Sequence, residues 1–411
     1  MINYKNSSRV FVTQVGIHSC LGRHFNETVS NLKNGVSGLV YEEIQGYPTA
    51  IGRIPFNIKH KNNEFKDKGL QLALNVVSQT DAASNIDSDR VGVFWGVGLA
   101  SAHCLENTFT QYIHSKGSAF LSPWTVADIM PNSVASQIAK TYGIRGGCWT
   151  LSNACASSAM AIGQGFQAIR QGHLDAAVVG GSDAMLIPPI LYAWSRMRVL
   201  TRTTAELAHE SCRPFDCHRK GLAISEGAAC LILQSERVIS NIQTTAMAEI
   251  TGFGHSCDAA DITKPLTEGQ LAAMYQALCD SGLPVDEIDY VCAHATGTLV
   301  GDPVEMHALK SLWRGHIPHC PISSLKSALG HSMAACGAMQ AVLCVSMLRD
   351  KWIAPTLYLD RPDDLWRDWW LPSSNVLNDY SLNHILSNSF GFGGINASLI
   401  LSAIHQKPKL I

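Results

Sequence analysis

The chain is short of charge. Asp, Glu, Lys and Arg supply 16% of its 411 residues, the formal net charge is −2, and no long run of lysine or arginine occurs. A protein that binds nucleic acid through a basic surface is therefore not expected. The chain also lacks an apolar run long enough to span a bilayer. Its N-terminus has no apolar signal core, so we expect no membrane association.

Paired cysteine motifs are absent too. The chain has 13 cysteines, an odd number, and none of them forms a C-x-x-C pair. This pattern favours free thiols in a reducing compartment, so the expected location is the cytoplasm. Hydrophobic residues make up 46% of the chain. With so little charge, this composition indicates a compact protein with a large core and excludes extended disorder.

Buried strands alternate with helices along the chain, which predicts an α/β fold with parallel strands covered on both faces. The order strand, helix, strand, helix appears twice, with a change near residues 237–245. We therefore predict an internal duplication with one half at 1–240 and the other at 241–411. In the first half we expect strands at 10–16, 91–95 and 176–179 and helices at 70–80 and 133–142.

One stretch, LSNACASSAMAIGQGFQAIRQG at 151–172, places Cys155 where a helix of small residues is expected to begin. A thiol at a helix N-terminus faces unpaired N–H groups and the positive end of the helix dipole, both of which favour thiolate. Gly163 and Gly165 weaken this helix, so we expect another backbone to pack closely against it. Taken alone, however, Cys155 fits a buried structural cysteine better than a nucleophile.

His294 lies just after a predicted buried strand, where parallel sheets gather their ligand sites. Asp302 and Glu305 follow with the spacing of a capping box, so the loop at 295–301 is expected to be held between two rigid elements. A histidine in such a loop can also be purely structural.

Two further segments carry candidate groups. His331 immediately precedes a second small-residue helix, whose N-terminus disfavours the imidazolium form, and a neutral ring suits polarisation of a carbonyl. Lys326, five residues earlier, would on its own be read as a solvated lysine. The run 391–394, Gly-Phe-Gly-Gly, is able to present backbone N–H groups, although an ordinary tight turn explains it as well.

Together these segments resemble the β-ketoacyl-[acyl carrier protein] synthases, the elongating condensing enzymes of fatty acid and type II polyketide synthesis. The resemblance runs almost end to end. It rests on motifs at 12–16 (VTQVG), 154–158 (ACASS), 213–216 (RPFD), 226–228 (EGA), 294–302 (HATGTLVGD), 326–331 (KSALGH) and 388–394 (NSFGFGG).

The resemblance implies a thiolase-like fold of two duplicated βαβαβαββ halves in five layers (αβαβα). It also implies the reaction. Cys155 would take an acyl chain from its carrier, malonyl-carrier protein would lose carbon dioxide, and the enolate would attack the acyl-Cys155. His294 and His331 would stabilise the enolate, with Lys326 nearby in the catalytic set. No bound cofactor or metal is implied, because both substrates arrive on the 4'-phosphopantetheine arm of acyl carrier protein.

Further positions follow from the resemblance. The backbone of Phe392 would help form the oxyanion hole while its ring gates the acyl pocket. Thr296 and Thr298 would hold the pantetheine arm, and Val97 would lie at the floor of the acyl pocket unless it is plain core. The substrate-binding set is completed by Phe390, Gly391 and Gly393, and the supporting set by Asp302, Glu305 and Gln340.

Partner surfaces are also implied. An acidic carrier protein could dock on basic side chains at Lys59, Lys61, Lys66, Lys68, Arg198 and Arg202, although the four lysines fit a solvated loop better. The family is dimeric, and 131–139 resembles its interface region. We therefore expect either a homodimer or a heterodimer with a chain-length-factor subunit.

Some positions depart from the family pattern. Gln340 stands where a glutamate is usual, so Lys326 would lack a carboxylate partner. Leu222 and Ser225 also differ from the usual residues, and three tryptophans at 366, 369 and 370 have no clear counterpart. These departures favour a specialised pathway over primary fatty acid synthesis.

Three other readings compete with the elongating synthase. A thiolase would need a second cysteine in the region of 388–394, where there is none. A starter-unit synthase would carry asparagine in place of His331. A non-catalytic chain-length factor would lack the nucleophile, so Cys155 argues against it while Gln340 keeps it open.

Overall fold

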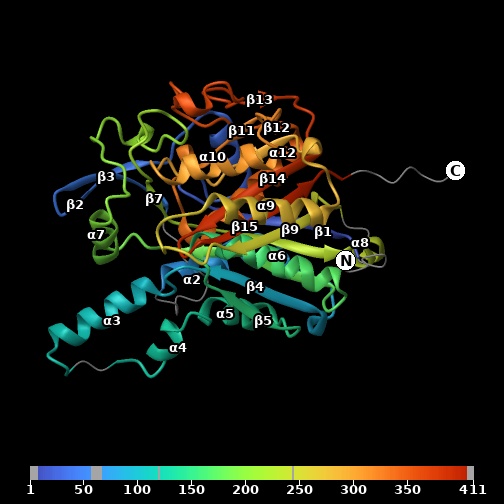
Figure 1. The fold of residues 1–411 in the computed structure, drawn as a ribbon. Coiled ribbons are helices and arrows are strands. Elements are labelled where there is room, and N and C mark those ends of the chain that lie inside the picture. The colour runs from blue at the N-terminus through green and yellow to red at the C-terminus, as the bar shows by residue number, and fades with distance from the viewer. Residues whose placement is uncertain (1–7, 57–66, 119–120, 243–244, 405–411) are drawn as a thin grey trace.

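A computed structural model of the protein describes residues 8–56, 67–118, 121–242 and 245–404 (Figure 1). Among these residues, ten strands form one sheet: β1 (Val10–His18), β4 (Val91–Val97), β5 (Cys148–Leu151), β6 (Ala176–Asp183), β8 (Gly227–Ser235), β9 (Ala248–Cys257), β10 (Tyr290–Cys292), β11 (Ile322–Ser323), β14 (His384–Gly391) and β15 (Ile395–Ser402). Their spatial order is β11-β10-β14-β15-β9-β1-β8-β6-β4-β5.

The chain follows the same path through each half of this sheet. In both halves the first strand lies beside the last, followed by the fourth, the second and the third. The strand directions also agree. In the first half, β8 is antiparallel to both of its neighbours, β1 and β6, whereas β6, β4 and β5 run parallel to one another. In the second half, β15 is antiparallel to β9 and β14, whereas β14, β10 and β11 run parallel. The two halves meet where β1 pairs with β9. The boundary predicted at residue 240 falls in the helix that joins them and stays a prediction.

The described helices are α1 (Phe25–Lys33), α2 (Lys68–Val77), α3 (Ala102–His114), α4 (Thr125–Ile129), α5 (Ser133–Tyr142), α6 (Ser157–Arg170), α7 (Pro188–Arg196), α8 (Glu236–Ile242), α9 (Thr267–Ser281), α10 (Gly301–Leu312), α11 (Lys326–Leu329) and α12 (Cys336–Asp350). None of them is both long and apolar enough to cross a bilayer, within the residues that the structure describes.

Helices α6 and α12 lie between the two halves of the sheet. They contact each other, and each packs on strands of both halves, while α2 and α5 cover the outer face of the first half and α9 that of the second, with α10 on α9. Every residue of α12 from Cys336 to Leu348 is buried. A helix that is buried on all sides needs an apolar surface all round, as its sequence provides. The predicted five layers of two repeated halves are confirmed.

The close approach predicted at Gly163 and Gly165 occurs, but side chains make it. A Cβ at Gly163 would collide with the ring of Phe253, and one at Gly165 with Val179. The prediction of an adjacent backbone was wrong, because α6 packs on strands whose large side chains fill the space above these glycines.

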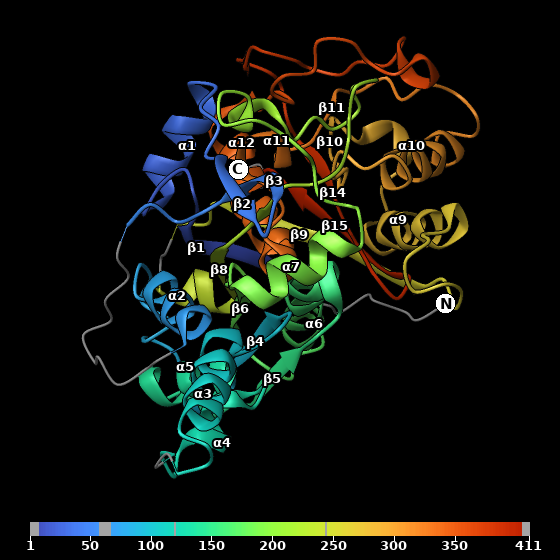
Figure 2. The ribbon, with the colours of Figure 1, turned by 90° about the vertical axis from the view of Figure 1, so that its left-hand side faces the viewer.

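Smaller elements lie outside the layers and were not predicted. A three-stranded sheet is formed by β2 (Val40–Ile44), β3 (Tyr47–Gly52) and β7 (Ile224–Ser225), and a two-stranded one by β12 (Trp352–Ile353) and β13 (Leu377–Asn378). Helices α3 and α4 extend from the end of the molecule where β4 and β5 lie (Figure 2). Strands of two residues are too short to show a periodic pattern, and α3 and α4 bury almost no apolar side chains.

Candidate active site

Cys155 lies in the connection between β5 and α6. Residues Ala154–Ala156 form a single 3-10 turn, and α6 begins only at Ser157, so the predicted helix start was two residues early. Ala154 has a φ of 49°, a conformation that non-glycine residues adopt at a cost of about 1 kcal/mol or more. This turn holds the Cys155 side chain in the interior, where only 9% of the residue is exposed.

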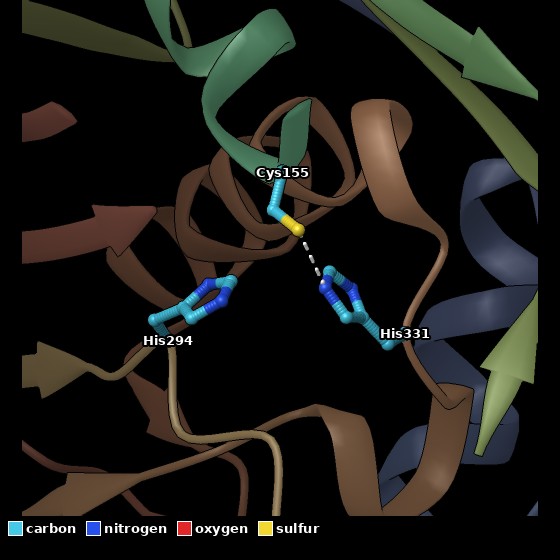
Figure 3. A group of neighbouring side chains, drawn as sticks. All are labelled: Cys155, His294 and His331. Carbon is cyan, nitrogen blue, oxygen red and sulfur yellow. Dashed lines mark hydrogen bonds between the residues drawn. The ribbon is translucent and has the colours of Figure 1, made fainter. Parts of the chain in front are cut away.

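Two histidines from the second half of the chain face the sulfur (Figure 3). His331 Nε2 lies 3.0 Å from Cys155 Sγ, and the rings of His294 and His331 meet edge to face with centroids 5.3 Å apart. One donor atom from each of the three residues lies within 4.8 Å of the others, and all three side chains are buried. The structure therefore brings together three residues that are 37 to 176 positions apart in the sequence.

Both imidazoles are held in the neutral form. Burial lowers the pKa of His331 well below its usual value, and the charge of Lys326 lowers it further. The pKa of His294 is lowered by burial, by Lys326 and by His331. The sequence predicted a neutral ring at His331 because a helix was expected to begin right after it, but α12 begins only at Cys336. Burial and Lys326 are the actual causes.

Cys155 is also held in its neutral form. Burial raises the pKa of the thiol well above its usual value, and the neighbouring Cys336 acts in the same direction. Lys326 and the backbone N–H of Phe392 lower the pKa, but burial dominates. The predicted thiolate is therefore wrong for the resting protein. Burial removes the thiolate from water, and this destabilises it more than the N-terminus of the adjacent helix stabilises it. A thiol beside a neutral imidazole is the resting arrangement.

Lys326 is buried, with 2% of the residue exposed, so the reading as a solvated lysine was wrong. Its Nζ donates a hydrogen bond to Gln340 Oε1 at 2.9 Å. Gln340 Nε2 in turn donates to the carbonyl oxygen of Asn388 at 3.0 Å. In the described part of the chain, Lys326 forms no ion pair with a carboxylate, as the glutamine at position 340 suggested.

The loop after His294 is fixed by two buried carboxylates. Asp302 Oδ1 accepts hydrogen bonds from the backbone N–H groups of Thr296, Gly297 and Thr298 at 3.0–3.3 Å, and its Oδ2 accepts from Phe215 N. Glu305 accepts from the backbone N–H groups of residues 294 and 295. Both carboxylates therefore hold the backbone that carries His294.

The predicted capping box is wrong. Helix α10 begins at Gly301, with Val300 as its N-cap residue and no side-chain cap. Asp302 already belongs to the helix and its carboxylate points back over the loop. The loop is still rigid, but its rigidity comes from contacts across the turn.

The Gly-Phe-Gly-Gly run forms the turn between β14 and β15. Gly393 and Gly394 have φ values of 82° and 68°, which glycine adopts without strain. A Cβ at Gly391 would lie 2.9 Å from Asn153 O and 3.1 Å from Cys155 N, so this turn packs directly against the nucleophile. The ring of Phe392 stacks on Trp194 of α7, with centroids 5.8 Å apart.

A loop that the sequence did not single out also holds this turn. Gly393 N donates to Ile262 O at 2.7 Å, and Asp258 N donates to Gly394 O at 2.8 Å. Neither this loop nor Trp194 belongs to a local pattern of the sequence. Only their position in space reveals them.

A cavity of about 530 Å³ opens at Cys155. The predicted residues that line it are Cys155, His294, Thr296, Thr298, Glu305, His331, Phe390, Gly391 and Phe392. Gly393, Lys326, Asp302 and Gln340 do not line it, and the last three are buried. Val97 does not line the cavity; it faces a small hollow beside Asp67 and Asp183. The structure therefore gives no support to Val97 as the floor of the acyl pocket.

Basic side chains surround the mouth of the cavity. Arg198 and Lys220 line both this cavity and an adjoining hollow, which Arg202 also lines. Lys68 instead pairs with Glu226. The other three predicted lysines, Lys59, Lys61 and Lys66, lie outside the described residues.

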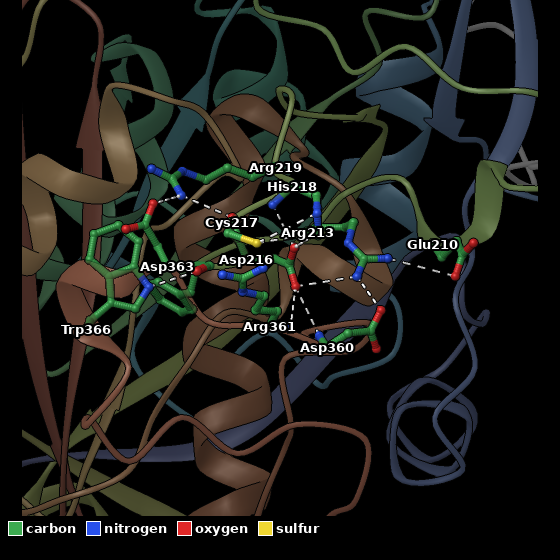
Figure 4. A network of polar contacts seen from close by, with 11 residues as sticks. Glu210, Arg213, Asp216, Cys217, His218, Arg219, Asp360, Arg361, Asp363 and Trp366 are labelled. Carbon is green, nitrogen blue, oxygen red and sulfur yellow. Dashed lines mark hydrogen bonds and ion pairs between the residues drawn. The ribbon is translucent and has the colours of Figure 1, made fainter.

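Hydrogen bonds and ion pairs tie the RPFD segment to the loop after residue 357 (Figure 4). Asp216 accepts hydrogen bonds from the backbone N–H groups of Asp360 and Arg361. Arg219 pairs with Asp363 and lies over the ring of Trp366, which is buried and donates to Phe215 O. Trp366, which the sequence left unplaced, thus supports the loop that carries Arg219.

The chain matches known proteins over most of its length. Residues 7–238 match the family model of the β-ketoacyl synthase N-terminal domain, and residues 247–360 match that of the C-terminal domain. Nodulation protein E of Rhizobium sp. (strain N33) is 31% identical over 95% of this chain and 98% of its own length. The 3-oxoacyl-[acyl-carrier-protein] synthase 2 of Staphylococcus aureus (strain COL) is 30% identical over 96% of this chain and 98% of its own.

Two solved structures are similar throughout. One is AntDE:AntF, a type II PKS acyl-carrier protein in complex with its ketosynthase bound to the hexaketide, with a TM-score of 0.89 and 26% identity over 97% of this chain and 100% of that chain. The other is the ishigamide ketosynthase/chain length factor, with the same TM-score, identity and coverage.

Proposed function

This chain belongs to the β-ketoacyl synthase family, and from that premise we propose that Cys155 carries an acyl chain which the protein condenses with malonyl-[acyl carrier protein]. The product is a 3-oxoacyl-[acyl carrier protein] extended by two carbons. The observation that supports this most strongly is the meeting of a buried thiol with two neutral imidazoles at the end of one cavity.

In the first step, Cys155 Sγ attacks the carbonyl carbon of an acyl thioester and the bond to the carrier's sulfur breaks. His331 Nε2, 3.0 Å away, donates its N–H to the sulfur as negative charge develops there, and the thiol proton leaves on the departing carrier thiol. The backbone N–H groups of Cys155 and Phe392 are the donors for the oxyanion that forms. Support for Phe392 comes from the contact of its turn with the backbone at Cys155.

In the second step, the malonyl carbon–carboxylate bond breaks and carbon dioxide departs. The electron pair passes into an enolate, whose oxygen accepts hydrogen bonds from His294 and His331. Neutral imidazoles suit this task because a ring N–H stabilises the growing charge without first giving up a proton. The enolate carbon then attacks the acyl carbonyl, and Cys155 leaves as thiolate and takes up a proton from solvent.

The pantetheine arm of the carrier would lie along Thr296 and Thr298, which line the cavity. Arg198, Arg202 and Lys220 at its mouth would attract an acidic carrier protein. Long-range attraction of this kind raises the rate of association more than the final affinity.

A partner subunit would cover α3 and α4. Large apolar side chains gather there with unusual exposure, including Phe109 (59%), Ile113 (67%), Trp124 (72%) and Val126 (66%). Apolar side chains at such density mark an interaction surface. The partner would be a second copy or a chain-length-factor subunit, as in the ishigamide ketosynthase/chain length factor.

The second candidate function is that of the non-catalytic chain-length factor. Gln340 is the observation that favours it, whereas the intact arrangement of Cys155, His294 and His331 favours the catalytic role. We place the reaction in a specialised type II polyketide or polyene pathway ahead of primary fatty acid synthesis.

The reaction itself is the test. The protein is incubated with acyl- and malonyl-loaded carrier protein, and released carbon dioxide and the 3-oxoacyl product are measured, with Cys155→Ala as the control. Product that depends on Cys155 is expected. A folded protein that makes no product, alone or with a co-expressed homologous subunit, would refute the catalytic role.

A further inference from the structure

The most unusual charge in the interior is that of Lys326. An ammonium group taken out of water is costly, so buried cations normally lie against a carboxylate. Lys326 is 2% exposed, and its hydrogen-bond partner is the neutral amide of Gln340 at 2.9 Å. No ion pair compensates this lysine within the part of the chain that the structure describes.

The surroundings of Gln340 match an amide. Its Oε1 faces the donor Lys326 Nζ, while its Nε2 donates to Asn388 O at 3.0 Å and toward Cys292 Sγ at 3.6 Å. These neighbours fix which end of the amide is oxygen. A carboxylate in the same place would set a negative oxygen against the Asn388 carbonyl. Glutamine is therefore the residue that this pocket is built to hold.

The charge of Lys326 reaches the reacting groups. It lowers the pKa values of Cys155, His294 and His331, and also that of Glu305, which holds the His294 backbone. Other groups around the sulfur act differently. Cys336 and Asp183 raise the pKa of Cys155, and Asp183 is itself buried with a pKa raised to about 7. Within the described structure, Lys326 is thus the one cation among the side chains that shift the pKa of Cys155.

We propose that Gln340 is a positioning residue that holds Lys326 as a cation with no carboxylate in contact, so that the site favours negative charge at Cys155 Sγ and at the enolate oxygen. The part that concerns the enolate rests on the proposed function. The part that concerns the thiol does not, since it needs no substrate.

The thiol is therefore the better reporter. The full-length protein and the variants Gln340→Glu and Gln340→Met are alkylated with iodoacetamide at several pH values, and the rate is followed on the Cys155 peptide by mass spectrometry. Gln340→Glu adds a negative charge beside Lys326, and we expect alkylation to slow about tenfold, equivalent to one pKa unit. Gln340→Met loses the same hydrogen bonds without adding a charge, so it reports the loss of positioning alone and should slow alkylation less than Gln340→Glu does.

Equal rates in Gln340→Glu and the unchanged protein would overturn the proposal, and so would equal slowing in both variants, which would indicate a packing effect. Adding Lys326→Met gives a second check, because Gln340→Glu should no longer slow alkylation through the lysine. If Gln340→Glu does not fold, Lys326→Met and Lys326→Arg answer the question. Slowing in Met but not in Arg supports the proposal, and equal rates in the two refute it.

The alkylation assay and the condensation assay test different proposals, so one can fail without the other. A protein that shows the charge effect but makes no 3-oxoacyl product would retain the proposal for Gln340 and lose the proposed function. The pH profile of carbon dioxide release then tests the enolate part, with Gln340→Glu expected to release it about tenfold more slowly at saturating malonyl-carrier protein.

Discussion

At the scale of single residues, the account depends on how burial acts on three side chains. The motifs around Cys155 and His331 are short and local, so the sequence alone was sufficient to select them. The protonation states of these side chains could not be predicted as well from the sequence. The sequence predicted a thiolate from a helix N-terminus, but the three-dimensional structure buries the sulfur and raises the pKa of Cys155. Burial depends on distant segments, which no local pattern reports.

His331→Ala separates the two chemical steps. The variant removes one of two donors to the enolate, so carbon dioxide release should fall about a hundredfold or more. Acylation of Cys155 should fall by a smaller factor, because the backbone donors of the oxyanion hole remain. Intact-protein mass and carbon dioxide release measure the two steps. Carbon dioxide release at the unchanged rate would refute the role of His331.

Buried His18 predicts a dependence of stability on pH. Burial lowers its pKa from 6.5 to about 4. The unfolded chain therefore takes up a proton near pH 6.5 that the folded protein refuses until about pH 4, and stability falls as the pH drops through this window. The loss amounts to roughly 3 kcal/mol.

Chemical unfolding of His18→Gln at several pH values tests this. Its free energy of unfolding should decline less steeply between about pH 6.5 and 4, by roughly 1.4 kcal/mol per pH unit. His255→Gln, at an exposed histidine, serves as the control. An unchanged slope in His18→Gln would contradict the assignment.

At the scale of elements, the loop after β10 shows where sequence patterns mislead. Asp302 and Glu305 have capping-box spacing, yet their carboxylates bind the backbone of residues 294–298 and of Phe215. Phe215 lies far away in the sequence, so this partner was invisible beforehand. Trp194 and the loop at 258–266 were missed for the same reason.

Asp302→Asn should therefore destabilise the protein. The amide offers one acceptor oxygen where the buried carboxylate serves four backbone N–H groups, and we expect a loss of about 3 kcal/mol in the free energy of unfolding. Urea unfolding measures this, with Asp364→Asn at an exposed carboxylate as the control. If the two variants lost equal stability, the loop would not depend on Asp302.

The turn after β14 predicts a local effect on catalysis. Gly391→Ala would push a Cβ against Asn153 O and Cys155 N, so acylation of Cys155 should slow at least about tenfold while the fold survives. Gly393→Ala strains the same turn through its φ of 82° but meets only Ile395 at 3.8 Å. Acylation as fast in Gly391→Ala as in Gly393→Ala would show that this contact does not position the nucleophile.

At the scale of the whole molecule, the duplicated fold was predictable because both halves repeat one order of strands and helices. The structure adds why duplication matters. Helix α6 follows Cys155 in the first half, α12 follows His331 in the second, and both helices pack in the shared central layer. The outer surface was less predictable, since α3 and α4 gave no clear sequence signal yet expose a cluster of large apolar side chains.

That cluster predicts assembly. In sedimentation experiments, the protein should behave as two associated subunits, either alone or with a homologous subunit, because so much exposed apolar surface is stabilised by burial. Ile113→Asp combined with Trp124→Arg should release monomers. A protein that is monomeric under both conditions before any substitution would contradict the interface.

The central claim is that Cys155 carries the growing chain, and the mass of the protein tests it most directly. After incubation with acyl-carrier protein, the account predicts an increase by one acyl group on the Cys155 peptide, and return to the original mass once malonyl-carrier protein is added. An acyl group on any other residue, or one on Cys155 that malonyl-carrier protein never removes, would contradict the account.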